Sequence, residues 1–334
     1  MAVINDMELS HTSVLMKEVL KALDVQPCDT VVDATVGGAG HFAKILAALG
    51  ADGVIVGIDA DPAAVERARA AYALDRRPER PVAHLVNNNF RNLAHVLERL
   101  GIGQITAALF DLGWSGYQIA VPRGFSFQQN EPLLMTYGLP AGEAGEEGLP
   151  GQGETAADIV NSSSEGDLAD IIFTYGEERF ARPIARAIVA ARSEERILTT
   201  GALVAAILAG IPAWYRKQKI HPATKTFQAL RIAANDELRA LRDGVTAVLS
   251  VLAPGGRLAV ISFHSIEDRI VKNLLRGAVQ TGLGSLVTKK PIVPSRAEII
   301  ANRRARSAKL RVFKRSAAAS HTATDSGRMM LSYA

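Results

Sequence analysis

A short strand followed at once by a glycine-rich turn is the feature that most constrains the fold. Residues 30–34 form a β-branched run containing Asp33, and Gly37, Gly38 and Gly40 follow closely. Glycine permits backbone angles and close approaches that a Cβ forbids, and the next helix offers free N–H groups at its start. The pattern predicts a strand, a nucleotide-binding loop and a helix; a plain tight turn is the alternative.

A second strand favours the ligand-binding interpretation. Residues 54–58 are strand-like and lead into Asp59, 19 residues after Gly40. An acid roughly 20 residues beyond such glycines is placed to bind ribose hydroxyls. Because Asp33 suits a cationic amine better than a pyrophosphate, the two carboxylates favour S-adenosylmethionine, which carries a sulfonium, over a dinucleotide. Asp61, which precedes a proline, is expected to be a helix N-cap.

Composition and charge distribution narrow the class of protein. The 334 residues are 48% hydrophobic and include one cysteine, so one large or two smaller packed domains without disulfides are expected. No apolar run of 18 residues and no leader-like N-terminus is seen, which favours a cytoplasmic protein. Residues 269–315 hold 13 Lys or Arg against one acid, Glu298. This segregation is typical of a nucleic-acid-binding face, and we expect 303–315 to contact phosphates; a solvated tail is the alternative.

Helix-like and strand-like segments alternate up to residue 112, which predicts an α/β fold with a mostly parallel sheet. After a loop rich in Gly, Pro and Glu at 138–154, the patterns are helical with no strand. We therefore predict one α/β domain, made of residues 1–120 and 222–334, interrupted by a helical insertion at 121–221. A single long helix over 225–252 is expected to lead into a Pro-Gly-Gly turn and a strand.

Motifs over nearly the whole chain are similar to those of one family. The Pro-Gly-Gly turn before a late strand is typical of class I S-adenosylmethionine methyltransferases. Further blocks are HTSVLMKEVL (11–20), DATVGGAGH (33–41), GIDADPAA (57–64), DLGWS (111–115), RGFSF (123–127), YGEERFA (175–181), HPATKTFQALRI (221–232) and PGGRLAVISFHSIEDRIVK (254–272). In this order they resemble the bacterial 16S rRNA (cytosine-N4) methyltransferase family, also called RsmH or MraW.

The resemblance implies a Rossmann-like, mostly parallel sheet with an inserted all-helical substrate-recognition domain. It implies S-adenosylmethionine as cofactor, the 16S rRNA of the 30S subunit as partner, and N4-methylation of a cytidine in the decoding region as the reaction. Besides Asp33, which is assigned from its own chemistry, the expected cofactor contacts are Ala39, Gly40, His41, Asp59, Phe90, Asp111 and Gln118. Phe90 is expected to pack on adenine, with a plain core position as the alternative.

Asp111 is the expected catalytic residue, because it ends the fourth strand at the sheet edge that faces the cofactor. Cytosine N4 is a poor nucleophile, since its lone pair is delocalised into the ring. The site must hold N4 in line with the methyl group and accept a hydrogen bond from the amino group as charge develops. A carboxylate does this without acting as a full general base.

RNA contacts are expected on both sides of a cleft between the domains. Trp114 is placed to stack on a base, with simple packing as the alternative, and His264 is expected to border the base pocket. Phosphate contacts are expected from Arg123, Lys225 and Arg231, beside His221. For His221 and Lys225 an alternative of equal weight is structural: they would cap the helix and stiffen the segment that leads from the insertion back to the sheet. One cysteine and seven scattered histidines give no zinc spacing, so no metal is expected.

Besides Ala39, which takes the place of the usual third glycine of the cofactor loop, four positions depart from the family pattern. Gly116 and Tyr117 replace a serine and a proline, and Leu134 and Thr136 replace an acid and an arginine near the substrate. These changes keep open a second function, an rRNA- or 30S-binding paralogue with weak or no methyltransferase activity. A DNA amino-methyltransferase is a third, less supported alternative, because the chain has no DPPY-like tetrapeptide.

Overall fold

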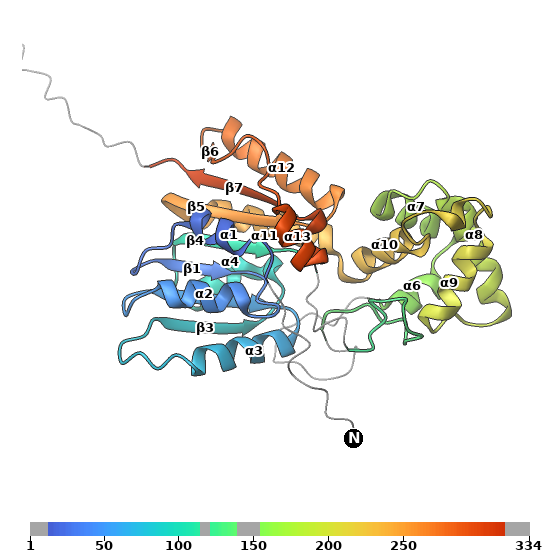
Figure 1. Cartoon of the computed structure of the whole chain (residues 1–334), viewed down its shortest axis with the longest axis horizontal. Helices are drawn as coiled ribbons and strands as arrows, with labels where there is room; N and C mark the ends of the chain where they lie inside the picture. The colour runs from blue at the N-terminus through green and yellow to red at the C-terminus, as the bar shows by residue number, and fades with distance from the viewer. Residues whose placement is uncertain (1–12, 114–120, 139–153, 318–334) are drawn as a thin grey trace, which may run out of the picture.

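A sheet covered by helices lies beside a separate group of helices in the computed structural model, which describes residues 13–113, 121–138 and 154–317 (Figure 1). The inner strands are almost continuously apolar, as strands buried on both faces must be. The strands are β1 (Thr30–Asp33), β2 (Val54–Asp59), β3 (Val82–Asn87), β4 (Ile105–Asp111), β5 (Leu252–Ser262), β6 (Gly284–Leu286) and β7 (Lys309–Arg315).

The seven strands form one sheet in the order β3-β2-β1-β4-β5-β7-β6. Strands β1 to β5 are parallel, and β7 runs antiparallel to its neighbours β5 and β6. The chain moves outward from β1 in one direction through β2 and β3, and in the other direction through β4 and β5. Connections therefore diverge at the carboxyl ends of β1 and β4, where sheets of this kind form their ligand crevice. The predicted α/β class is confirmed.

Two apolar clusters fill the two faces of the sheet. One face packs against α1, α2 and α3 and the other against α4, α11 and α12. These helices are α1 (Met16–Leu23), α2 (Gly40–Ala48), α3 (Pro62–Ala73), α4 (Leu93–Arg99), α11 (Glu237–Val251) and α12 (Ser265–Gln280). Strand β4 shows the alternation, since Ala108 and Phe110 face one cluster while Ala107 and Leu109 face the other. Among the described helices, none is both long and apolar enough to cross a membrane.

A third apolar cluster belongs to the second group of helices, called here the helical unit. Its helices are α6 (Ala156–Ser162), α7 (Glu165–Gly176), α8 (Ala181–Glu194), α9 (Thr200–Ala209) and α10 (Ala223–Asn235). Helix α10 contributes Phe227 and Leu230 to this core. The helical unit therefore continues past residue 221, where the insertion was expected to end, and its boundary lies nearer the end of α10.

The predicted long helix over 225–252 is wrong, because the structure divides it into α10 and α11 at Asp236. Asp236 has left-handed backbone angles, φ 46° and ψ 43°, which an aspartate tolerates better than most residues. The preceding Asn235 explains the break. Its Nδ2 donates to the carbonyl of Met135 at 2.7 Å, and its Oδ1 accepts from the N–H of Tyr137 at 3.0 Å. This long-range pairing fixes the bend, which helical periodicity alone cannot reveal.

The basic C-terminal segment is neither a solvated tail nor a free phosphate-binding arm. Residues 309–315 form β7, between β5 and β6, and Leu310, Val312 and Phe313 are buried. Arg311 Nε donates to Asp268 at 2.7 Å. The expectation that all of 303–315 contacts RNA is corrected accordingly. In a strand inside the sheet, the backbone pairs with the neighbouring strands and the apolar side chains pack into the core.

We expect replacement of Phe313 by alanine to destabilise the protein strongly. The ring is fully buried in the cluster shared with α11 and α12, and truncating such a ring costs about 3–5 kcal/mol of unfolding free energy. Urea denaturation measures the loss. The control is Lys314→Ala on the neighbouring exposed position, which should change the unfolding free energy by about 0.5 kcal/mol or less. Equal losses for the two variants would contradict an inner role for β7.

Candidate active site

A glycine loop opens the crevice at the carboxyl end of β1. Gly37 and Ala39 both have left-handed backbone angles, with φ of 52° and 61°, and α2 begins directly after them. Gly40 lies against the segment before α1, where a Cβ would stand only 2.1 Å from Ser13 Oγ. Gly40 therefore keeps the close packing of the loop, and the first N–H groups of α2 point toward the crevice.

Asp59, at the end of β2, fixes this loop. Its Oδ2 accepts from the N–H of Gly37 and its Oδ1 from the N–H of Asp61, both at 2.8 Å. Asp61 in turn accepts from the N–H of Ala63 at 3.1 Å, so its predicted N-cap role is confirmed. Burial raises the pKa of Asp59 to about 6, although the two backbone donors favour its ionised form. A carboxylate held in this way keeps lone pairs for ribose hydroxyls.

Asp33 and Asp111 form the floor of the crevice between β1 and β4. Thr35 links them: its N–H donates to Asp33 Oδ1 at 3.2 Å, and its Oγ1 accepts from the N–H of Asp111 at 2.6 Å. Burial, with the nearby Asp59 charge, raises the pKa of Asp33 to about 7. Burial, with the charges of Asp33 and Glu267, raises the pKa of Asp111 to about 8.

The arrangement of these acids fits a cationic ligand. Asp33 Oδ2 and Asp111 Oδ1 are buried and have no hydrogen-bond partner among the described residues. Two desolvated carboxylates side by side are costly unless a positive group neutralises them. The sulfonium and amine of S-adenosylmethionine supply such charge. His41 lies at the same place, with Nε2 3.5 Å from Asp111 Oδ2.

Phe90 lies at the side of the crevice, at the start of the 3-10 turn after β3. Its ring packs edge-on against Phe110, with centroids 5.4 Å apart, and it is only half-buried. Gly244 on α11 makes room for it, since a Cβ there would lie 2.9 Å from the ring. Phe90 thus has a packing role on one side and an exposed part that remains available to adenine.

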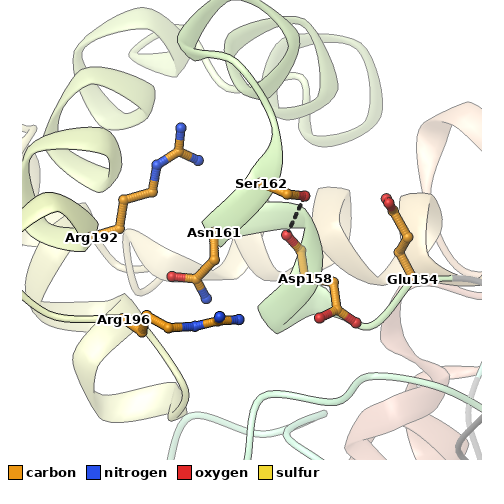
Figure 2. A pocket seen from close by; sticks show the side chains of 6 residues that line it. All are labelled: Glu154, Asp158, Asn161, Ser162, Arg192 and Arg196. Carbon is orange, nitrogen blue, oxygen red and sulfur yellow. Dashed lines mark hydrogen bonds between the residues drawn. The ribbon is translucent and has the colours of Figure 1, made fainter.

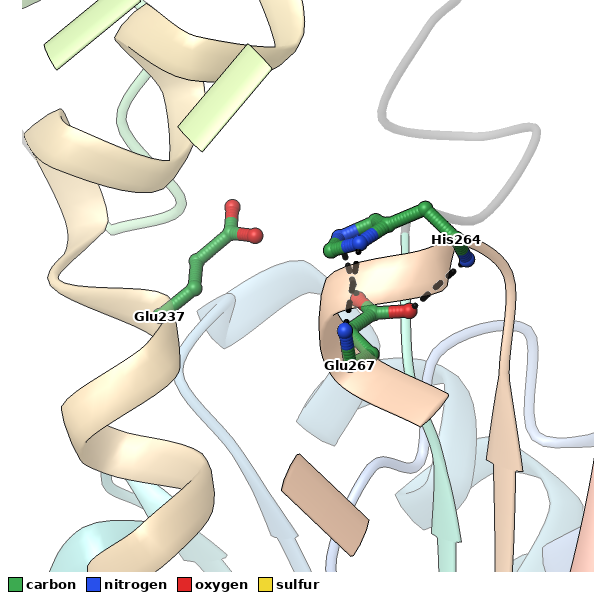
Figure 3. A group of neighbouring side chains, drawn as sticks. All are labelled: Glu237, His264 and Glu267. Atoms are coloured by element: carbon green, nitrogen blue, oxygen red, sulfur yellow. Dashed lines mark hydrogen bonds and ion pairs between the residues drawn. The ribbon is translucent and has the colours of Figure 1, made fainter. Parts of the chain in front are cut away.

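A second polar cluster lies at the start of α12, toward the helical unit (Figure 3). His264 Nδ1 accepts from the N–H of Glu267 at 3.3 Å, and the Glu267 carboxylate accepts from the N–H groups of Phe263 and His264. Glu237 extends from α11 toward the His264 ring. Glu237 also accepts from Tyr137 Oη at 2.9 Å and pairs with Arg231 at 2.7 Å. This cluster joins the two units at the crevice.

Three of these groups, Glu237, His264 and Glu267, bring possible metal-ligand atoms within 4.8 Å of one another. The hydrogen bonds favour another role. Nδ1 of His264 accepts the backbone N–H of Glu267, and Nε2 lies 3.1 Å from Glu267 Oε1 as an ion-pair neighbour if the ring is protonated. The charge of Glu237 is met by Arg231. The expectation of no metal stays a prediction.

Two of the expected phosphate ligands are otherwise engaged. Arg231 is only 4% exposed and paired with Glu237, so its expected phosphate contact is corrected: the guanidinium is shielded from solvent and its partner is internal. Arg123 donates to the carbonyl of Tyr137 at 2.8 Å and pairs with Asp61 at 3.2 Å. These contacts tie the segment before the helical unit to the cofactor side of the sheet, and the phosphate contact expected of Arg123 stays a prediction.

His221 and Lys225 lie at the start of α10. His221 Nδ1 accepts from the N–H of Ala223 at 3.2 Å, and its ring stacks on Phe127 with centroids 4.7 Å apart. Lys225 Nζ donates to the carbonyl of Glu177 at 2.8 Å. These contacts favour the capping and stiffening alternative for both residues, while the exposed side of His221 leaves an RNA contact open as a proposal.

Trp114 and Gln118, like the departures Gly116 and Tyr117, lie outside the described residues. Of the other two departures, Thr136 is buried and Leu134 is half-buried.

Sequence reasoning missed three links between the two units. Glu177, at the end of α7, accepts from Ser265 Oγ at 2.7 Å and also pairs with Arg269. Arg91 pairs with Asp236 at 3.1 Å, and Tyr137 reaches Glu237. The run at 267–269 reads locally as a helix-start charge cluster, and nothing in the sequence reveals that Arg269 serves the helical unit. Only Glu267, three residues after His264, follows the spacing of a capping box.

A pocket of about 400 Å³ lies in the helical unit, away from the crevice. It is lined by Glu154, Asp158, Asn161, Ser162, Arg192 and Arg196 (Figure 2). Its polar groups serve local structure, since Asp158 caps α6 with Thr155 and Arg192 donates to the carbonyl of Val160. The site is therefore assigned to the sheet edge.

The chain is similar to proteins of one family. The model of the MraW methylase family matches residues 8–316. Ribosomal RNA small subunit methyltransferase H of Deinococcus radiodurans is 47% identical over 92% of this chain and 91% of that protein. The protein of the same name from Syntrophotalea carbinolica is 44% identical over 91% and 98% of the two chains. A solved rRNA methylase from Streptococcus thermophilus aligns over 94% of this chain and 99% of that chain, at 12% identity and a TM-score of 0.38.

The strand order, the glycine loop and the acids at the ends of β1, β2 and β4 define a class I S-adenosylmethionine-dependent methyltransferase. S-adenosylmethionine is the cofactor of this class. With a family match over residues 8–316 and relatives above 40% identity along both chains, the protein belongs to the MraW methylase family.

Replacing Ala39 by glycine should stabilise the protein. Ala39 holds a left-handed φ of 61°, which costs an L-residue with a Cβ about 1–2 kcal/mol and glycine almost nothing. Because glycine also gains freedom in the unfolded chain, we expect a net gain of about 0.5–1 kcal/mol in unfolding free energy. The control is Ala43→Gly inside α2, where the same change should destabilise by about 1 kcal/mol. Destabilisation by Ala39→Gly would contradict this account of the loop.

The raised pKa of Asp111 predicts a pH-dependent affinity for S-adenosylmethionine. At a pH below the pKa of about 8, the carboxyl of Asp111 is protonated in the free protein, so binding a cationic ligand must release that proton. At a pH above the pKa the carboxylate is already ionised and no proton is released. Relative to Asp111→Asn, the wild type should therefore bind more tightly as the pH rises from about 6 to 9, by up to roughly tenfold per pH unit below the pKa. Titration of the ligand's own amine affects both proteins equally. Parallel affinities across this range, measured by calorimetry, would refute a protonated Asp111.

Proposed function

We propose that this chain transfers a methyl group from S-adenosylmethionine to N4 of a cytidine in the rRNA of the small ribosomal subunit. The observation that carries the proposal is the buried acid pair at the β1–β4 crevice in a chain of the MraW methylase family. The relatives' name, ribosomal RNA small subunit methyltransferase H, supports the substrate class. Cytosine N4 as the acceptor rests on the resemblance of the sequence motifs.

The residues of the crevice divide the work between binding and chemistry. Bound S-adenosylmethionine supplies an electrophilic methyl group. Asp59 holds the ribose, the loop around Ala39 and Gly40 offers backbone N–H groups, and Asp33 meets the amine. Asp111 accepts a hydrogen bond from the cytosine amino group, whose positive charge grows as the new bond forms. The low-polarity surroundings that raise its pKa also strengthen this interaction.

A basic edge supports an RNA substrate. Because β7 is antiparallel to β5 and begins at Lys309 beside Ser262, the turn before it lies at the carboxyl edge of the sheet, near the crevice. That 3-10 turn, Arg303–Ser307, exposes Arg303, Arg304 and Arg306. These arginines, rather than the strand that follows, are placed to contact phosphates. An assembled 30S particle or its 16S rRNA is then the partner, and the cytoplasm is the expected place of action.

The decisive assay uses methyl-labelled S-adenosylmethionine and 30S particles that lack the modification, followed by nucleoside analysis of the rRNA. Labelled N4-methylcytidine is the expected product. Label on another atom of the rRNA would replace cytosine N4 as the acceptor. Binding of 30S without any transfer would favour the alternative, an rRNA-binding paralogue, for which the departures Leu134 and Thr136 provide the reason.

Asp111→Asn should reduce turnover by roughly 100-fold or more at saturating S-adenosylmethionine, because one preorganised electrostatic contact to the developing charge is lost. Binding of rRNA should change little, since it depends on the basic edge. The matched control is Asp52→Asn, an exposed carboxylate in the turn before β2, which should retain full turnover. Undiminished turnover in Asp111→Asn would remove the residue from the catalytic role.

A further inference from the structure

An aromatic cluster on the surface of the helical unit takes no part in the site described above. It consists of Phe180, Trp214 and Tyr215, with ring centroids 4.7–5.9 Å apart, and of Arg179. We call these four residues the Trp214 cluster. Tyr215 is buried beneath it, whereas the indole of Trp214 is 56% exposed. A large aromatic ring left this open is a candidate contact for a partner.

Arg179 lies over all three rings. Its guanidinium carbon is 4.7 Å from the ring centroid of Trp214, 4.8 Å from that of Phe180 and 5.2 Å from that of Tyr215. At these distances the cation is attracted to the ring faces. The cluster thus offers two flat groups to a ligand, an indole and a guanidinium, and one of them is positively charged.

A buried acid holds two of the aromatic residues of the cluster, Tyr215 and Phe180, in place. Glu178, which is fully buried, accepts from Tyr215 Oη at 2.8 Å through Oε2 and from the N–H of Phe180 at 2.9 Å through Oε1. Burial and the contact with Glu178 raise the pKa of Tyr215 to about 12, so its hydroxyl stays a donor. A platform fixed in this way loses little conformational entropy when a ligand stacks on it.

The surroundings of the cluster are positively charged. Arg182, Arg216, Lys217 and Lys219 are exposed near it in the sequence, and no ion pair to an acid is recorded for these four within the described part of the chain. The two nearby acids are engaged, Glu178 inside the cluster and Glu177 with Ser265 and Arg269. Exposed flat groups among cations are the combination by which proteins bind single-stranded nucleic acid.

The cluster also lies close in sequence to a contact between the helical unit and the start of α12. Glu177, two residues before Arg179, contacts Ser265, which directly follows His264 of the polar cluster in Figure 3. A strand of RNA that places one base at the carboxyl edge of the sheet can therefore continue across the end of α7 to the Trp214 cluster. A protein partner would account for the apolar ring but not for the uncompensated cations.

We propose that Trp214 and Arg179 form a stacking site for an unpaired nucleotide of the RNA substrate, separate from the base that is methylated. This site rests on the proposed function in one respect only, the identity of the RNA. The site accepts any unpaired base, because every base has a ring face that can stack, and the adjoining phosphate lies near the cations. Bound in this way, the nucleotide anchors the substrate strand on the helical unit.

Tryptophan fluorescence tests the site directly. The chain has two tryptophans, Trp114 and Trp214, so Trp114→Phe leaves Trp214 as the only reporter. An unstructured single-stranded oligoribonucleotide should quench its emission, and an RNA duplex of the same length at the same concentration should quench it far less, because its bases are already stacked. Equal quenching by both RNAs, or no quenching by a single strand that Trp114→Phe still binds with measurable affinity, would overturn the proposal.

Affinities of variants in the otherwise native chain provide the second test. Trp214→Ala should weaken binding of the single strand by roughly 5- to 100-fold, whereas Trp214→Phe should retain most of it. Arg179→Ala should weaken binding and lower its salt dependence by about one released counterion. The matched control is Phe173→Ala on α7, a ring 64% exposed outside the cluster, which should bind as the wild type does. An equal loss in Phe173→Ala, or none in Trp214→Ala, would overturn the site.

Methyl transfer to 30S particles separates this proposal from the proposed function. If the wild type transfers no methyl group but Trp214→Ala still weakens RNA binding, the function fails and the stacking site stands. If the wild type methylates rRNA and Trp214→Ala matches it in both RNA affinity and transfer at limiting rRNA, the stacking site alone is overturned.

Discussion

Desolvation of acidic groups at the carboxyl edge of the sheet is the constraint on which the rest of the structure depends. Asp33 and Asp111 end neighbouring strands; Asp33 is buried and Asp111 is half-buried, and each keeps one buried oxygen without a hydrogen-bond partner among the described residues. Such an arrangement is costly for the free protein, and the raised pKa of each carboxyl expresses that cost. The apolar sheet around the two acids compensates for this cost, and in the proposed function a cationic cofactor would recover it as binding energy.

The connection between the sheet and the helical unit is polar and local. Asn235 fixes the bend before Asp236, and Glu237 then meets Tyr137 and Arg231 close to the crevice. On the other side, Glu177 contacts the start of α12. Because each contact involves residues beside the crevice, the orientation of the helical unit and the shape of the substrate side are set together.

Local patterns predicted much of this. The strand before the glycines, the acid after β2 and the N-cap at Asp61 follow from rules that act over a few residues, and all three lie where expected. Patterns fail where partners are distant. The break at Asp236 depends on Met135 and Tyr137, and the roles of Arg231 and Arg123 depend on Glu237 and Asp61. A guanidinium reads in sequence as a phosphate ligand until its internal partner is known.

The sequence by itself determined the α/β class, the glycine loop, the acids of the crevice and the family. Each of these depends on residues that are close together in the sequence: the period of a strand, the glycines of a turn and the order of short motifs. Only the tertiary structure decided which basic residues remain available for RNA. Residues 309–315 look like part of a basic tail, yet they become an inner strand because Leu310, Val312 and Phe313 find an apolar cluster formed by remote helices and strands. Arg179 and Trp214, 35 positions apart, meet for the same reason. Burial and charge pairing depend on residues that are distant in the sequence and come together only in the tertiary structure.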